Sequence, residues 1–273
     1  MSKYLIHDAS QLSGVAPQTV RRYEDMGLIG DTRDDITGYR YFDISDIHLL
    51  LKSRVYRAYG FTLKETKELL DEKDIHNAAS LFKGRAQAVE KEITWQKYIL
   101  DHLLAKVRLL EEAKNLEHSL TLTTRPAMLG ILMRRGLKIT EKPKTRRCFS
   151  RWMKYMPLPQ PFLYCDEDDS LDWEDRYSMG LCVTQEEADF LGFKAEMPAF
   201  YLAPCPCVYT VALIYADGPA DQDNLSPILK KMAEQGLICS GPICGRSIMP
   251  LNRQTRLQTY FELWFPYKSP SST

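Results

Sequence analysis

The sequence predicts an α+β protein whose helices dominate the first 118 residues and whose strands lie almost entirely after them. Three observations support this prediction. Short helical segments punctuated by glycine occupy residues 1–75, and an uninterrupted helical pattern follows over residues 76–118. Residues 120–267 then hold strand-like runs that alternate with helical ones. A chain of 273 residues is long enough for two units with separate hydrophobic cores.

The first pair of helices predicts a helix-turn-helix in residues 9–26. Gly14 can adopt the left-handed backbone conformation that the turn requires, and Pro17 suits the first turn of the second helix. The helical period turns Val20 and Tyr23 inward. The side chains left to face a DNA major groove are Gln18, Thr19, Arg21 and Arg22.

A hairpin wing is expected next, because polar residues 30–37 precede the β-rich segment 38–42. Asp43 is a good N-cap for a helix over residues 44–59, and Thr62 with Glu65 forms a capping box for the following helix. The wing and the capped helix add further basic and aromatic residues to the set of predicted DNA contacts. The predicted DNA contacts are Gln18, Thr19, Arg21, Arg22, Tyr23, Arg33, Tyr39, Arg40, Arg54 and Arg57.

Net charge does not by itself favour DNA binding in this region. Residues 1–75 hold 11 Lys and Arg against 13 Asp and Glu, whereas affinity for duplex DNA comes from cations that face phosphates. Binding therefore requires the cations to gather on one side. The wing carries Asp31, Asp34 and Asp35 where basic residues or proline are expected. The DNA contacts predicted for the second helix are therefore better supported than those predicted for the wing. Paired arginines on a solvated helix face are the alternative explanation.

Five segments resemble the MerR family of bacterial transcription regulators, in that family's order and spacing. They are Ser13-Gly14-Val15, Thr19-Val20-Arg21-Arg22-Tyr23-Glu24, Gly27-Leu28-Ile29, Gly38-Tyr39-Arg40 and Gly60-Phe61-Thr62-Leu63. The resemblance implies a winged helix-turn-helix that binds double-stranded promoter DNA. It further implies activation by bending and untwisting an over-long promoter spacer, so that RNA polymerase engages both promoter elements.

Residues 76–118 predict a long dimerisation helix. Apolar residues recur at alternating gaps of three and four, which is a heptad seam typical of coiled coils. The seam consists of Ala79, Phe82, Ala86, Val89, Ile93, Gln96, Leu100, Leu103, Val107 and Leu110. The alternative is an amphipathic helix that lies on its own domain. The MerR resemblance implies antiparallel pairing with a second copy, in which the polar Gln96 would fix the register.

The remaining segment, residues 120–267, predicts a separate α+β domain. Residues 123–126 suggest a hinge. The expected elements are strands over 127–133, 178–184, 207–216 and 257–265, strands on either side of 241–242, helices over 146–155 and 225–235, and a turn at 217–219. Two βαββ halves of this kind favour two small sheets around a cleft.

Several motifs of this segment resemble the GyrI-like effector-binding domain. They are Ala216-Asp217-Gly218-Pro219, Gln235-Gly236-Leu237, Gly241-Pro242 and Glu262-Leu263-Trp264-Phe265-Pro266. Together with the MerR-like front, this resembles the multidrug-sensing regulators of that family. The resemblance implies that Glu262 is the charge anchor of a ligand pocket.

The last strand itself suggests a site for a lipophilic, cationic effector. Period-two alternation places Tyr260, Glu262 and Trp264 on one face, and a carboxylate between aromatic rings attracts a cation. The predicted ligand contacts are Glu262, Tyr260, Trp264, Trp152, Tyr155, Trp173 and Tyr209. The alternative is that the aromatics are packing residues and that Glu262 is solvated. The acidic run 166–175 is expected to be a solvated loop.

No enzyme, cofactor or metal site is expected. Cys205 and Cys207 lack a nearby His or further Cys, which makes a poor zinc site. Seven cysteines, no apolar signal segment and no membrane-spanning run predict a cytoplasmic protein with reduced thiols. The other function that remains open is a GyrI-like small-molecule hydrolase or drug-sequestering protein with a vestigial DNA-binding domain, which the acidic wing favours.

Overall fold

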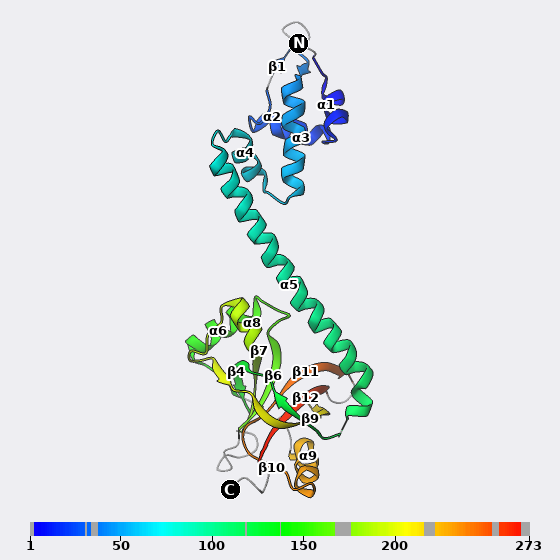
Figure 1. Cartoon of the computed structure of the whole chain (residues 1–273), viewed down its shortest axis with the longest axis vertical. Helices are drawn as coiled ribbons and strands as arrows, with labels where there is room; N and C mark the ends of the chain where they lie inside the picture. The colour runs from blue at the N-terminus through cyan, green and yellow to red at the C-terminus, as the bar shows by residue number, and fades with distance from the viewer. Residues whose placement is uncertain are drawn as a thin grey trace. The chain divides into compact units, whose positions relative to one another are not determined.

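The computed structural model describes residues 3–30, 32–33, 38–117, 119–136, 138–166, 176–215, 222–252 and 257–268. The chain divides into two compact units, residues 1–95 and 96–273, and the long helix α5 (Ile75–Leu116) contributes residues to both (Figure 1). Each unit has its own hydrophobic core. The predicted α+β class is confirmed.

The first unit contains the predicted helix-turn-helix and wing. Its elements are α1 (Ile6–Ser13), α2 (Pro17–Asp25), β1 (Thr32–Arg33), β2 (Arg40–Tyr41), α3 (Ile44–Ala58) and α4 (Leu63–Asp71). Gly14 ends α1 with φ of 63°, the left-handed conformation expected for the turn. Val20 and Tyr23 of α2 lie in the core with Ala9, Phe42 and Leu50. That buried stripe fixes which face of α2 remains exposed.

Side-chain caps set the start of the next two helices, as the sequence predicts. The Asp43 carboxylate accepts the Asp46 backbone N–H at 2.9 Å at the start of α3. At the start of α4, the Thr62 hydroxyl accepts the Glu65 N–H at 3.2 Å and the Glu65 carboxylate accepts the Thr62 N–H at 2.6 Å. These bonds satisfy backbone donors that a helix cannot pair internally. The start of each helix is therefore determined by residues within its first turn.

Part of the predicted seam of α5 is exposed to solvent in the single chain. Leu100, Leu103 and Val107 are 54%, 57% and 50% exposed within the single chain. The second unit instead packs against a different face of α5, which carries Tyr98, His102, Ala105, Lys106 and Leu109. Leu100, Leu103 and Val107 are therefore not the surface by which α5 packs on the second unit, whereas Phe82, near the start of the seam, contacts Tyr56, Tyr59 and Phe61 of the first unit.

Within the described residues of the second unit, ten strands form one antiparallel sheet (Figure 1). The central order is β3-β9-β12-β11-β6-β7-β4-β5, with β10 beside β12 and β8 beside β4. The strands are β3 (Thr121–Arg125), β4 (Met128–Arg135), β5 (Lys138–Ile139), β6 (Gln160–Cys165), β7 (Tyr177–Thr184), β8 (Phe200–Leu202), β9 (Cys205–Tyr215), β10 (Ile238–Cys239), β11 (Ile243–Asn252) and β12 (Leu257–Lys268).

The expected pair of small sheets is wrong, because β6 and β11 join the two halves. Ile243 of β11 pairs with Cys165 of β6, and the antiparallel ladder continues to Arg246 and Phe162. The expected hinge at residues 123–126 is also corrected, since most of it belongs to β3, which pairs with β9. Strand β6 was not predicted, because prolines interrupt residues 157–161 at its start. The predicted turn at 217–219 lies outside the described residues.

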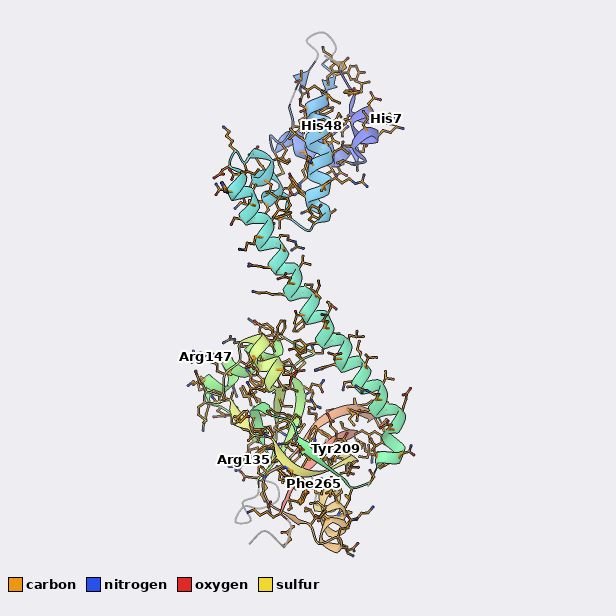
Figure 2. All side chains as sticks on the ribbon, viewed as in Figure 1. His7, His48, Arg135, Arg147, Tyr209 and Phe265 are labelled. Atoms are coloured by element: carbon orange, nitrogen blue, oxygen red, sulfur yellow. The ribbon has the colours of Figure 1, made fainter. Side chains whose placement is uncertain are left out.

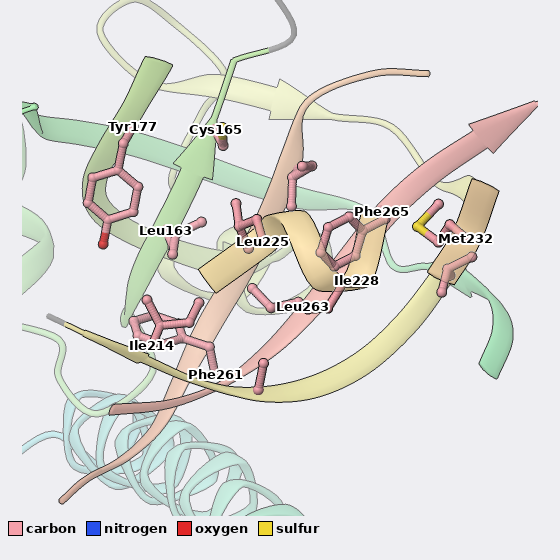
Figure 3. Close-up of a cluster of buried hydrophobic side chains, with 13 residues drawn as sticks. Leu163, Cys165, Tyr177, Ile214, Leu225, Ile228, Met232, Phe261, Leu263 and Phe265 are labelled. Carbon is pink, nitrogen blue, oxygen red and sulfur yellow. The ribbon is translucent and has the colours of Figure 1, made fainter. Parts of the chain in front are cut away.

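Three helices cover one face of the sheet, called here the helix-covered face. They are α6 (Pro143–Met153), α8 (Gln185–Leu191) and α9 (Gln222–Glu234). Figure 3 shows Leu225, Ile228 and Met232 of α9 beside Leu263 and Phe265 of β12, in one buried cluster. Because side chains alternate along a strand, Glu262 and Trp264 point to the opposite face. This confirms the predicted alternation in the last strand.

The opposite face, called here the charged face, carries Glu262 and Trp264 of β12, Arg246 of β11, Phe162 of β6 and Tyr209 of β9. Residues 102–109 of α5 lie against part of it, because Lys106 donates to carbonyls of β11 and this stretch of α5 lines a cavity together with Arg246 and Glu262. Among the described residues, no helix is long and apolar enough to cross a membrane.

Replacing Leu103 by Asp is expected to give monomers. Leu103 is 57% exposed within the single chain, so the substitution leaves the unit itself intact, whereas a charge buried in a coiled-coil seam is strongly unfavourable. Sedimentation velocity checks the oligomeric state. Arg108→Asp, an equally acidic change off the seam, is the matched control and should leave the dimer intact. A dimer that survives Leu103→Asp would contradict the seam.

Candidate functional site

The exposed face of α2 presents the polar side chains expected of a recognition helix. Gln18, Arg21 and Arg22 are exposed and Thr19 is half-buried. Neither arginine forms an ion pair with a residue that the structure describes. Tyr23, by contrast, is only 5% exposed and packs in the core of the unit, and its contact with DNA stays a prediction. It holds α2 in place from the inside and does not offer its ring to a ligand.

Three of the predicted contact arginines are engaged in the fold itself. Arg40 of β2 donates from Nε to the Glu24 carboxylate at 2.7 Å and so neutralises a buried acid of α2. Arg54 of α3 donates to the carbonyls of Ser13 and Gly14, which fastens α3 to the turn. Arg57 donates to the Phe61 carbonyl at the α3–α4 junction. These bonds give Arg54 and Arg57 bracing roles within the unit.

The described part of the wing leaves two predicted residues exposed. Arg33 of β1 pairs across the ladder with Arg40 of β2, and both Arg33 and Tyr39 are exposed, Tyr39 by 66%. Asp31, Asp34 and Asp35 lie outside the described residues. The candidate DNA surface of the structure is therefore the exposed face of α2 together with Arg33 and Tyr39.

On the charged face of the second unit, Glu262 is already paired with a cation of the protein. Arg246 and Glu262 are directly opposite each other in the β11–β12 ladder, and Arg246 Nε donates to Glu262 Oε1 at 2.6 Å. The guanidinium carbon lies 5.2 Å from the centroid of the Trp264 ring. Tyr209, which is labelled in Figure 2, donates its hydroxyl to Glu262 Oε2 at 3.5 Å. The carboxylate is thus bound on both oxygens.

Residues of α5 close this site from the other side. Lys106 Nζ donates to the carbonyls of Ser247 and Ile248 at 3.3 and 2.9 Å, where β11 has a bulge. One helical turn away, His102 contacts the Glu187 carboxylate of α8 and, at 2.7 Å, the Gln160 amide of β6. A cavity of about 50 Å³ remains between α5 and the sheet. Its lining includes His102, Ala105, Lys106, Leu109, Gln160, Arg246, Ser247, Ile248 and Glu262.

Burial shapes the protonation of this site. It lowers the pKa of Lys106, an effect that Glu262 opposes and Arg246 reinforces. It raises the pKa of Tyr209, and the neighbouring Glu262 carboxylate raises it further. Tyr209 therefore stays a neutral phenol that donates to Glu262 at any physiological pH. The two cations Arg246 and Lys106 then face the carboxylate of Glu262.

The sheet separates the aromatic residues that the sequence analysis grouped into one pocket. Tyr260, Glu262 and Trp264 share a face, and Tyr209 lies beside Trp264 with ring centroids 5.8 Å apart. Trp152 instead stacks on Phe193 at 4.7 Å, and Tyr155 contacts the same ring. That cluster packs on the helix-covered face, so Trp152 and Tyr155 do not reach Glu262. Trp173 lies outside the described residues, as does most of the acidic run 166–175.

Sequence reasoning missed Arg246, Lys106 and His102. Arg246 lies in an expected strand, but only the register of β11 against β12 shows that it faces Glu262. Lys106 and His102 are off the heptad seam and looked like solvated positions of a helix. The available signal was the spacing of four residues between His102 and Lys106, which places both on one face of the helix away from the heptad seam.

The cysteines offer little chemistry in this conformation. Cys207 is fully buried, and burial raises its pKa to about 12, which keeps it a neutral thiol. In the part of the chain that the structure describes, no group of three His, Cys, Asp or Glu side chains is placed to hold a metal ion.

The comparisons with known proteins centre on the first unit. Residues 4–73 match the family model described as MerR HTH family regulatory protein. The HTH-type transcriptional regulator HmrR of Rhizobium leguminosarum bv. viciae is 36% identical over 114 residues, which are 41% of this chain and 81% of HmrR. The multidrug-efflux transporter 2 regulator of Bacillus subtilis is 27% identical over 110 residues, 40% of each protein. The EcmrR–DNA complex covers 98% of this chain and 100% of its own at 16% identity, with a TM-score of 0.37.

A helix-turn-helix with a short wing, followed by a long helix, defines a class of DNA-binding transcription regulators. The chain belongs to the MerR family of helix-turn-helix regulatory proteins. The chain spans most of HmrR but less than half of the multidrug-efflux regulator.

Glu187→Gln is expected to destabilise the second unit in a pH-dependent way. Burial raises the pKa of Glu187, but hydrogen bonds from His102 and Thr184 outweigh it and leave the pKa below the ordinary 4.5. A lowered carboxyl pKa adds stability above 4.5 that is lost as pH falls through the folded value. We expect a loss of about 1–2 kcal/mol in the free energy of unfolding at pH 7.

Denaturant titrations of the full chain, followed by tryptophan fluorescence at pH 7 and at pH 3, measure this difference. It should shrink at the lower pH, because the stability that comes from the lowered pKa of Glu187 is progressively lost as pH falls below 4.5. Glu186→Gln, on the exposed neighbour, is the matched control. A pH-independent loss would show that the charge of Glu187 is not what stabilises the contact with His102.

Proposed function

We propose that this chain is a homodimeric, ligand-controlled transcription activator that binds promoter DNA through its first unit and a lipophilic effector through its second. The observation that carries the DNA-binding part is the exposed, unpaired face of α2 with Gln18, Arg21 and Arg22, in a unit of the MerR family. Arginines on a recognition helix supply both base contacts and phosphate contacts.

The exposed seam of α5 supports the dimer. A stripe of apolar residues that stays about half exposed in the single chain needs a partner, and a second copy presents the same heptad pattern. A dimer carries two α2 helices, as binding to a pseudo-palindromic operator requires.

The charged face supports the effector site. Glu262 is 7% exposed and lies between Tyr209 and Trp264, so a ligand there would meet a carboxylate and two rings. Aromatic faces and a carboxylate attract lipophilic cations. A protein named as a multidrug-efflux regulator among the relatives is consistent with such a ligand.

The proposed mechanism is distortion of the promoter spacer, which lets RNA polymerase engage both promoter elements. The deformation cost depends on the sequence and length of the spacer. The effector shifts the dimer toward the distorting state only if it binds that state more tightly than the resting one. Transcription in vitro from the gene's own upstream region, with spacers of native and shortened length, tests this. Effector dependence that disappears with the shortened spacer supports distortion.

Arg21→Ala is expected to weaken operator binding and to reduce its salt dependence. Losing one cation that faces phosphate lowers the slope of log affinity against log salt by about 0.9. Fluorescence anisotropy with the gene's own upstream DNA, titrated at several salt concentrations, measures both quantities. Arg21→Lys is the control that keeps the charge and should keep the slope. An unchanged affinity and slope for Arg21→Ala would contradict the docking of α2.

Glu262→Gln is expected to separate cationic from neutral ligands. The change keeps the shape of the side chain but removes its charge, so affinity for the probe methyltriphenylphosphonium should fall by on the order of 1.5–3 kcal/mol. Neutral triphenylphosphine oxide, with the same three rings, should change little. Titration calorimetry measures both, and DNA binding without ligand should be unaffected. Equal losses for the two probes would mean that Glu262 does not anchor a charge.

A further inference from the structure

The guanidinium of Arg246 already makes the two contacts that a lipophilic cation would make at Glu262. Its Nε donates to Glu262 Oε1 at 2.6 Å, and its Cζ lies 5.2 Å from the centroid of the Trp264 ring. A carboxylate and an aromatic face are the groups that bind cations in water-excluded sites. The cation site of the proposed function is therefore filled by the protein itself.

The sheet holds Arg246 at this position. Arg246 and Glu262 are cross-strand partners on adjacent central strands, so the two side chains meet without any long-range adjustment. The Arg246 side chain is 21% exposed and that of Glu262 is 9% exposed. Little water reaches the pair, which strengthens the attraction between the two charges.

The remaining space is too small for a second cation. The cavity beside the pair measures about 50 Å³, whereas sites for drug-sized ligands measure roughly 300–1,000 Å³. The cation Lys106 also lines this cavity, and its amine donates to the carbonyl oxygens of Ser247 and Ile248. An incoming cation that left Arg246 in place would face two positive charges and one carboxylate, so it must displace the guanidinium.

We infer that Arg246 is an internal competitor that occupies the effector site and sets its ligand specificity; this rests on the proposed function of Glu262. Because the guanidinium must leave Glu262 before another cation binds there, the charge attraction that the ligand gains at this carboxylate is partly offset. The remaining gain comes from apolar area that the ligand buries against Trp264 and Tyr209 and that a guanidinium cannot offer. The site thus rejects small hydrophilic cations and admits bulky aromatic ones.

The test compares cation affinities with and without the competitor. Arg246→Gln removes the guanidinium and leaves Glu262 charged, so the affinity of the full-length protein for methyltriphenylphosphonium should rise at least ten-fold. Triphenylphosphine oxide should gain far less, because it does not use the freed carboxylate. The double variant Arg246→Gln with Glu262→Gln should lose the gain. Titration calorimetry gives all of these affinities.

A folding control accompanies each variant, because Arg246→Gln leaves a buried carboxylate with fewer partners. Circular dichroism and thermal melting show whether the second unit is intact. Should it unfold, Arg246→Lys keeps a cation but loses the planar stack on Trp264. That variant is expected to bind methyltriphenylphosphonium several-fold more tightly than wild type.

Different binding results would contradict the role of Arg246 and the proposed role of Glu262. If wild type binds the phosphonium in a Glu262-dependent way but neither Arg246 variant binds it more tightly, Arg246 is not a competitor and the inference is overturned alone. If no folded variant binds the phosphonium, the cationic ligand class falls as well. If wild type binds tetraphenylborate and Arg246→Gln does not, Arg246 is a contact for anionic effectors, which also overturns the inference.

Discussion

The buried carboxylate of Glu262 is the constraint around which the second unit is arranged. A carboxylate that is 7% exposed on a central strand must be met by cations and hydrogen-bond donors, because an unpaired buried charge is strongly destabilising. Arg246 and Tyr209 bind its two oxygens from the strands on either side of β12. The same constraint explains why aromatic rings, and not aliphatic core residues alone, surround the pair. Trp264 accepts the guanidinium over its ring, which an aliphatic side chain cannot do.

The helix α5 has two functional faces: an exposed apolar face and a polar face that packs on the second unit. Leu100, Leu103 and Val107 repeat at the spacing of a coiled coil and stay exposed. His102 and Lys106, on another face of the same turns, bind Glu187 and the carbonyls of β11. A helix with only the apolar stripe could pair with a second copy without regard to the sheet. The polar stripe binds this part of α5 to the second unit, so Leu100, Leu103 and Val107 of the same turns stay exposed on another face.

Local signals made the first unit predictable, and non-local pairing limited prediction of the second. Gly14, Asp43 and the Thr62–Glu65 box act within a few residues, and the structure confirms the elements they predict. Alternation in β12 is equally local and confirmed. The single sheet depends on β6 meeting β11 across 77 or more residues of sequence, a register that no short pattern encodes. For the same reason the Arg246–Glu262 pair was not predicted, and Trp152, predicted as a ligand contact together with Glu262, lies on the helix-covered face.

At the bulge in β11, the backbone of the sheet accepts hydrogen bonds directly from α5. Arg246 is followed at once by Ser247 and Ile248, and the register shift there turns both carbonyls to Lys106. The ladder with β6 ends at Arg246 and the bulge lies directly after it, so the Ser247 and Ile248 carbonyls accept hydrogen bonds from the helix at an irregular part of β11. Burial lowers the pKa of Lys106, which shows that its ammonium gives up hydration to make these bonds. A backbone shift at Arg246 therefore changes the contacts of a partly desolvated cation on α5.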